Sequence, residues 1–181
     1  MALLKIARMG HPVLRAVAQP VPDPTDPEIR RLAADMIETM ADAPGVGLAA
    51  PQVHESRRII VFRVPADRSG GPAVDTTVLI NPVIEPVGDG MELGWEGCLS
   101  IPGLRGLVPR HAHIRYRGVG LAGETVAGEA RGFHARVIQH ETDHLDGVLY
   151  IDRMPDLRYL AFNEEAQHLA AALSRGEEEG D

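Results

Sequence analysis

The chain of 181 residues contains a single cysteine, which cannot form an internal disulfide, so a small secreted scaffold held together by disulfides is excluded. No apolar run approaches the ~20 residues that a membrane-spanning helix needs. The N-terminal residues lack the apolar core and the small-residue cleavage site of a secretory signal. We therefore expect a cytoplasmic protein without a membrane partner. Lys and Arg number 18 against 26 Asp and Glu, and the net charge of -8 argues against stable nucleic-acid binding.

The remaining composition is that of a globular protein, with 44% hydrophobic and 24% charged residues. This length predicts one domain, because domains usually span about 100–200 residues. We place a single domain at residues 1–175 and a frayed acidic tail at residues 176–181.

Secondary structure follows from periodicity. Asp26 and Pro27 are typical of a helix start, and apolar residues spaced by three or four predict an amphipathic helix over residues 27–43. A second helix is expected over 133–146 and a terminal helix over 156–173. Short β-branched or alternating runs predict strands at 58–64, 77–84, 113–117 and 124–130, with an exposed loop at 65–75. Strands followed by a buried helix favour an α+β fold.

The most specific motif is His140-Glu141-Thr142-Asp143-His144 in the second predicted helix. Histidines four residues apart share one helix face, so both imidazoles can reach one cation. Glu141 lies about 100° round the helix from His140, where a carboxylate can act on water without being a ligand. Two surface histidines on a solvated helix are the alternative. The apolar residues on the same helix favour a metal site.

Two histidines do not complete a catalytic metal site, which usually has three protein ligands and one open position. One candidate for the third ligand is Cys98, whose thiolate is a strong ligand, although a lone cysteine is often only a buried apolar residue. The other is Glu164, twenty residues after His144, a spacing similar to that of thermolysin-like zinc peptidases. The residues alone leave both candidates open.

A third segment, GVGLAAPQ at residues 45–52, is expected to be a loop in which small residues let another backbone approach closely. It is not a phosphate-binding loop, because it contains no lysine and no helix is expected after it. Gln52 is either a surface amide or, in a catalytic cleft, a donor to an oxyanion.

Taken together, GVGLAAPQ at 45–52, EGCLS at 96–100 and QHETDH at 139–144 resemble, in order and spacing, the motifs of the peptide deformylases. The resemblance extends from about residue 6 to residue 154. It implies a metal-dependent hydrolase that removes the formyl group from the N-terminal formyl-methionine of newly made proteins. It also implies an α+β fold with antiparallel or mixed sheets around a central metal-binding helix and a C-terminal helix. Cys98 is thereby favoured over Glu164.

The resemblance also implies roles for individual residues. Cys98, His140 and His144 would hold one divalent metal ion, Fe²⁺ in the cell, with Zn²⁺, Ni²⁺ or Co²⁺ as replacements in purified protein. Glu141 would be the general acid and base, and Gln52 with the backbone N–H of Leu99 would bind the oxyanion. The substrates would be N-formyl-methionyl nascent peptides, and a transient contact with the ribosome is a further candidate interaction. Residues implied to bind substrate are Val46, Gly47, Gly97, Arg105, Phe133 and Val137.

The chain departs from the common bacterial pattern at Phe133 and Arg136, which are similar to the organellar branch of the family. Both lie on the helix face of His140, where aliphatic residues are usual. Arg136 either binds substrate or pairs with an acid of the protein, and the residues leave both open. Glu96 and Arg110 are expected to pair behind Cys98, with Asp143 supporting the metal-binding helix. Ordinary surface or packing roles are expected for His11, His54, His111, His113, His134 and His168.

Overall fold

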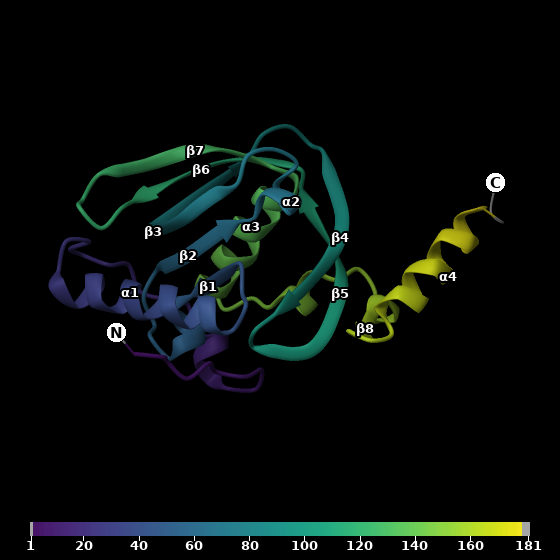
Figure 1. Cartoon of the computed structure of the whole chain (residues 1–181), viewed down its shortest axis with the longest axis horizontal. Coiled ribbons are helices and arrows are strands. Elements are labelled where there is room, and N and C mark those ends of the chain that lie inside the picture. Colours follow the sequence, from purple (N-terminus) through teal and green to yellow (C-terminus); the bar gives the residue numbers. More distant parts are fainter. Residues whose placement is uncertain (1, 179–181) are drawn as a thin grey trace.

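The structure, a computed structural model, describes residues 2–178 and contains two antiparallel sheets with one helix between them (Figure 1). Residues 179–181, the end of the predicted acidic tail, lie outside the described residues. The larger sheet has the strand order β1-β2-β3-β6-β7, with bounds Gly47–Ala49, Ile59–Val64, Val74–Pro86, His113–Val119 and Thr125–Arg131. The smaller sheet has the order β4-β5-β8, with bounds Met91–Cys98, Ile101–His111 and Leu160–Phe162.

The central helix α3 (Gly132–Leu145) packs against β1, β2 and β5, so it contacts both sheets. Every residue from Ala135 to Leu145 is buried, which is unusual for a helix that carries so many polar side chains. The expected helix over 133–146 is confirmed, and Gly147 ends it with a positive φ of 72°. The chemistry-bearing motif therefore lies at the centre of the molecule.

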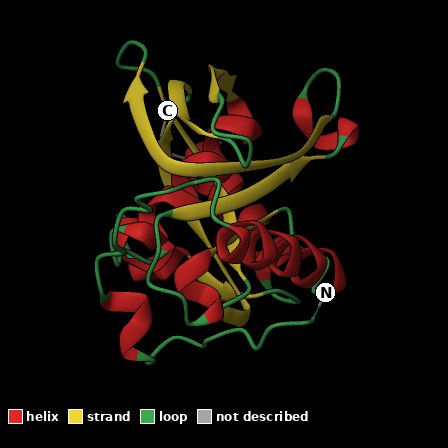
Figure 2. Ribbon diagram, turned by 90° about the vertical axis from the view of Figure 1, so that its left-hand side faces the viewer, coloured by secondary structure: helices red, strands yellow, loops and turns green. Residues whose placement is uncertain are grey.

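The strand β2 is apolar on both faces because both faces of the larger sheet are covered. Ile60 and Phe62 pack against α3, whereas Ile59 and Val61 pack against α1 (Pro27–Asp42). The predicted helix start is also confirmed, since the Asp26 side chain accepts a hydrogen bond of 2.8 Å from the backbone N–H of Glu28. The N-terminal segment and α1 lie together on one side of the strands (Figure 2).

Four expectations need correction. The expected terminal helix over 156–173 is wrong in its first half: residues 157–159 form a short 3-10 helix, β8 follows, and the helix α4 begins later (Ala166–Glu178). The tail was expected to begin at residue 176, but residues 176–178 still belong to α4. The loop over 65–75 contains a short helix, α2 (Ala66–Ser69), and β3 begins at Val74. The segment 45–52 forms strand β1 and the start of a 3-10 helix, η2 (Ala50–Val53).

The sequence patterns missed β4 and β5. These two strands contain Gly94, Gly97, Pro102 and Gly103, residues that are uncommon inside strands. Their pairing is nevertheless the most extensive of the smaller sheet, with Glu96 opposite Gly106 and Cys98 opposite Ile101. No helix in the described part of the chain is long and apolar enough to cross a membrane.

Candidate metal centre

Three potential ligands converge from two elements. Cys98 lies at the end of β4, and His140 and His144 lie one turn apart on α3. Their ligand atoms all lie within 4.8 Å of one another, with 3.3 Å between Cys98 Sγ and His144 Nε2. Glu164 is solvent-exposed and is not part of this cluster, so the structure does not support the alternative in which it is the third ligand.

The donor set fits a divalent transition metal ion. One thiolate sulfur and two imidazole nitrogens suit Zn²⁺, Fe²⁺, Co²⁺ or Ni²⁺, and three protein ligands leave a coordination position open. Burial lowers the pKa of His144 well below its ordinary value. This favours the neutral imidazole that a metal ion requires.

Glu96 holds His140 in place. Its Oε2 lies 2.8 Å from His140 Nδ1, which leaves Nε2 of that ring for a metal ion. Arg110 donates to both carboxylate oxygens, at 2.8 and 3.0 Å, so the expected pair across the smaller sheet is confirmed. Burial alone would raise the pKa of Glu96, but the hydrogen bonds from Arg110 and His140 lower it well below its usual range. The carboxylate therefore stays charged.

Asp143 lies in the same network. Its Oδ2 accepts from Arg110 Nη1 at 2.5 Å, and its Oδ1 accepts from Arg153 Nη2 at 2.8 Å. Two arginines thus fix the helix side chain that lies one residue before His144. The part played by Arg153 has no signal in the sequence, because it depends on where the chain turns back after α3.

Glu141 is buried beside the cluster, and its Oε2 has no hydrogen-bond partner among the described residues. Burial raises its pKa to about 7. The carboxylate lies directly over Gly47, where an added Cβ would come within 2.2 Å of Oε1. A free carboxylate with this pKa can both accept and return a proton near neutral pH, and only glycine at position 47 leaves room for it.

The side chain of Gln52, in η2, is held with its amide NH₂ toward the candidate metal ligand Cys98. Its Oε1 accepts from the backbone N–H of Ala49 at 2.8 Å. Its Nε2 lies 3.4 Å from Cys98 Sγ and 3.1 Å from Ser100 Oγ. The surface-amide alternative is therefore wrong, because the side chain is buried and its donor faces the candidate metal site.

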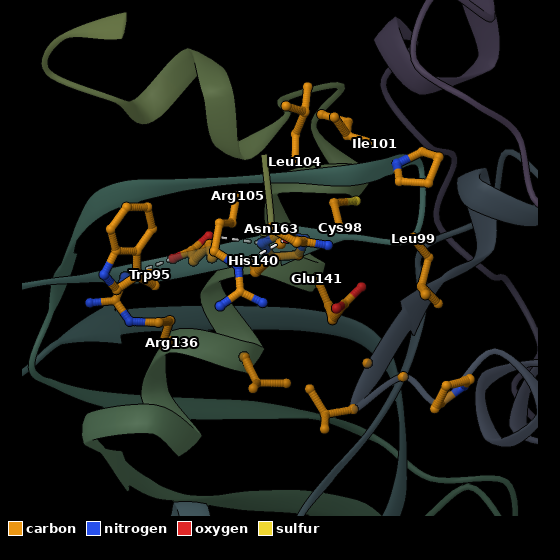
Figure 3. A pocket seen from close by; sticks show the side chains of 18 of the residues that line it. Trp95, Cys98, Leu99, Ile101, Leu104, Arg105, Arg136, His140, Glu141 and Asn163 are labelled. Carbon is orange, nitrogen blue, oxygen red and sulfur yellow. Dashed lines mark hydrogen bonds and ion pairs between the residues drawn. The ribbon is translucent and has the colours of Figure 1, made fainter. Parts of the chain in front are cut away.

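A cavity of about 460 Å³ opens beside these groups (Figure 3). Cys98, His140 and Glu141 lie at its inner side, and Leu99 follows Cys98 along the rim. Every residue that the sequence implied for substrate binding lines this cavity: Val46, Gly47, Gly97, Arg105, Phe133, Arg136 and Val137. Other residues that line the cavity have no signal in the sequence motifs, among them Trp95 on β4 and Asn163 directly after β8.

Arg136 lines the cavity, but protein groups occupy its guanidinium. Nη1 donates to Glu96 Oε1 at 2.8 Å and to the carbonyl of Val108 at 2.7 Å, and Nη2 donates to the carbonyl of Glu92 at 2.7 Å. The side chain is only 8% exposed. Of the two alternatives for Arg136, these contacts favour pairing with an acid over binding substrate.

Gly94 gives Arg136 its space, and a Gly94→Ala substitution tests this. An added Cβ at position 94 would lie 2.8 Å from Arg136 Nη2 and 2.9 Å from Cζ. We expect Gly94→Ala to lower the free energy of unfolding by about 1–3 kcal/mol, because overpacking a buried contact has such a cost. In an Arg136→Met background most of this loss should disappear. Urea unfolding of the four proteins measures the coupling, and equal losses in both backgrounds would contradict it.

Tyr150, in the 3-10 helix η3 (Tyr150–Arg153), also packs on a ligand. Its ring stacks on the His140 ring with centroids 6.1 Å apart and an interplanar angle of 21°. Ser100 contacts Gln52 on the other side of the cluster. Neither contact is visible in the motif spacing. The contact of Ser100 depends on the turn between β4 and β5, and the contact of Tyr150 depends on the path of the chain after α3.

The sequence pattern of the family described as polypeptide deformylase matches residues 3–159. Peptide deformylase 1 of Bordetella pertussis is 55% identical over 161 residues, which cover 88% of this chain and 92% of that protein. Peptide deformylase 2 of Ralstonia nicotianae is 49% identical over 163 residues, which cover 88% of this chain and 91% of that protein.

Solved structures show the same likeness. The K3U-bound class I type b peptide deformylase from Acinetobacter baumannii has a TM-score of 0.79 and 37% identity, covering 85% of this chain and 100% of that chain. The peptide deformylase from Thermotoga maritima has a TM-score of 0.77 and 40% identity, covering 86% of this chain and 100% of that chain. The α+β arrangement of antiparallel sheets and a C-terminal helix is thereby confirmed.

Proposed function

Because this chain belongs to the polypeptide deformylase family, we propose that it is a metal-dependent hydrolase that removes the formyl group from N-terminal formyl-methionine of newly made polypeptides. One observation carries this function: Cys98, His140 and His144 converge, and two of these ligands line a cavity together with the free carboxylate of Glu141. We assign the whole activity to one catalytic domain, residues 1–175.

Each group in the cavity has a part in the reaction. A divalent metal ion held by Cys98, His140 and His144 supplies, when bound, a Lewis acid that lowers the pKa of water and polarises a carbonyl. Glu141 accepts the proton of the attacking water and delivers it to the leaving amine. The Nε2 of Gln52 and the backbone N–H of Leu99 donate to the oxygen on which negative charge develops.

The substrate peptide lies along β1. This strand is at the edge of the larger sheet, so the backbone of Gly47 is placed to pair with an extended peptide. The side chain of the formylated methionine lies among Val46, Gly97, Phe133 and Val137, which line the cavity near Glu141. Arg105 lies toward the part of the peptide that follows methionine.

Formate release tests this function. We expect the metal-loaded protein to deformylate formyl-Met-Ala-Ser and to leave the acetylated peptide of the same sequence intact, because a confined cavity beside Glu141 admits the smaller acyl group. Removal of the metal ion by a chelator should abolish the activity, and its return should restore it. Failure to release formate from the formylated peptide at full metal occupancy would overturn the function.

The oxyanion role of Gln52 makes a separate prediction. Gln52→Leu should keep its metal ion and lower kcat about 10²–10³-fold with a smaller change in KM, because its hydrogen bond strengthens in the transition state. Gln52→Glu keeps an acceptor for the Ala49 N–H and loses the donor, but it also places a buried negative charge beside Cys98 Sγ. Both variants should therefore lose turnover. A change confined to KM would argue against the role.

Ferrous iron is the metal ion that we propose for the cell. A thiolate is the form of cysteine that oxidises, and with Fe²⁺ in the site oxygen chemistry occurs next to this sulfur. The iron-loaded protein should therefore lose activity in air, whereas the nickel-loaded protein survives. Metal analysis of anaerobically purified protein and intact mass spectrometry during aerobic decay check both points. Equal decay of the two forms, with unmodified Cys98 and full metal occupancy, would contradict the proposal.

The cellular setting follows from the substrate. We propose that the protein acts in the cytoplasm and contacts the ribosome transiently, because its substrates are the N-termini of nascent chains. Fractionation of cells, and sedimentation with ribosomes that carry short nascent chains, test the two parts separately.

A further inference from the structure

Two arginines at the outer part of the cavity are held by uncharged partners. The guanidinium carbon of Arg68, on α2, lies 3.8 Å from the centre of the Phe133 ring. The Nε of Arg105, on β5, donates to Asn163 Oδ1 at 2.9 Å (Figure 3). Both arginines line the cavity. Among the side chains that the structure describes, neither forms an ion pair.

The other arginine that lines the cavity, Arg136, is ion-paired. Arg136 pairs with Glu96, and Arg110 pairs with both Glu96 and Asp143. The two carboxylates that line the cavity, Glu96 and Glu141, are buried and belong to the catalytic cluster. The positive charge of Arg68 and Arg105 is therefore uncompensated within the cavity, in a chain whose net charge is -8.

Two other acids lie near these arginines but do not line the cavity. Asp67 precedes Arg68 in the chain, and Glu164 lines an adjoining hollow together with Arg105. Burial lowers the pKa of Arg68, the carboxylate of Asp67 raises it, and the charge of Arg105 lowers it to a smaller extent. Because both arginines line the same cavity, a negative group bound there would be attracted by both.

Resting on the proposed function, we propose that Arg68 and Arg105 form a cationic rim that favours formyl-methionyl chains with an acidic side chain soon after methionine. Arginine guanidinium groups bind carboxylates through paired hydrogen bonds, and opposite charges at a site entrance increase productive encounters. Phe133 and Asn163 fix the two side chains beforehand, so little freedom is lost on binding. The carboxylate belongs to a side chain, because the C-terminus of a nascent chain is still attached during synthesis.

The test compares formyl-Met peptides that are amidated at the C-terminus. At one position they carry Glu, Gln or Lys, and this position is moved in turn through residues two, three and four of the peptide. We expect kcat/KM to follow the order Glu, Gln, Lys at the favoured position, with about a tenfold span at low ionic strength and most of the difference in KM. The span should shrink at about 1 M salt, where the Debye length is ~3 Å. A free-acid peptide series measures any separate effect of a terminal carboxylate.

Variants assign the effect to the rim. Arg68→Ala should reduce the Glu-to-Lys ratio at least threefold, and Arg68→Glu should invert the order of the three peptides. Arg68→Lys should retain part of the ratio, since it keeps the charge without the planar stacking on Phe133. Arg31→Ala is the matched control, because Arg31 is an exposed arginine on α1 and does not line the cavity. It should leave the ratio unchanged.

The outcomes separate this proposal from the function on which it rests. Equal kcat/KM for the three peptides, or an unchanged ratio in Arg68→Glu, would overturn the rim and leave the deformylase function standing. A lack of formate release from all three peptides would overturn the function and the rim together. A preference seen only in the free-acid series would assign the site to terminal carboxylates and contradict selection by side chain.

Discussion

Glu141→Ala is expected to retain its metal ion and to lose turnover by about 10²–10⁴-fold or more, because the side chain moves the proton without ligating the metal. The carboxylate has a free oxygen and lies over Gly47 rather than being held by a basic side chain. Its removal therefore leaves the Cys98, His140 and His144 cluster in place. Metal analysis checks that the variant retains its metal ion, and formate release measures its loss of turnover. A metal-free variant would refute a role of Glu141 that is confined to proton transfer.

The pH profile offers a second measurement on the same residue. Burial raises the pKa of Glu141 to about 7, and the base form that activates water is present above this pKa. The activity should fall as the pH drops through this range, and a nearby metal ion shifts the fall to lower pH because it favours the carboxylate. The residual activity of Glu141→Ala should lack this acidic limb.

Cys98→Ala is expected to abolish both metal retention and activity, because two imidazoles alone leave the site short of the ligand number that such sites use. Glu164→Ala is the matched control, and it should leave both nearly intact since Glu164 is exposed outside the cluster. Metal content after dialysis and formate release distinguish the variants. An inactive, metal-free Glu164→Ala beside an active Cys98→Ala would overturn the assignment of the ligands.

The parts that sequence predicted well are those with a local physical signature. The helix over 27–43 follows from its apolar face and from Asp26, and the metal pair follows from the four-residue spacing of His140 and His144. Each of these signals lies within a few turns of its own helix. The choice of Cys98 as the third ligand did not follow from spacing. It came from the ordered match of three segments to a family.

The parts that sequence missed depend on contacts between distant segments. In β4 and β5, glycine occurs where a distant side chain approaches closely, as at Gly94 and Gly106, and where φ is positive, as at Gly103. Gly94 is the clearest case, since its lack of a side chain makes room for an arginine 42 positions later. A glycine inside a strand can signal close approach, but it does not say to what. Arg68 likewise shows its place only once α2 lies beside α3.

The contact between Gly94 and Arg136 restricts the order in which substitutions can accumulate in this cavity. A side chain at position 94 and an arginine at position 136 occupy the same space, so glycine must be present before the arginine can enter. Once Arg136 is hydrogen-bonded to Glu96, a larger residue can no longer replace the glycine at position 94. Adding a side chain at position 94 while Arg136 is kept will therefore yield destabilised proteins. Libraries that vary positions 94 and 136 together give access to the pocket shapes that single changes cannot reach.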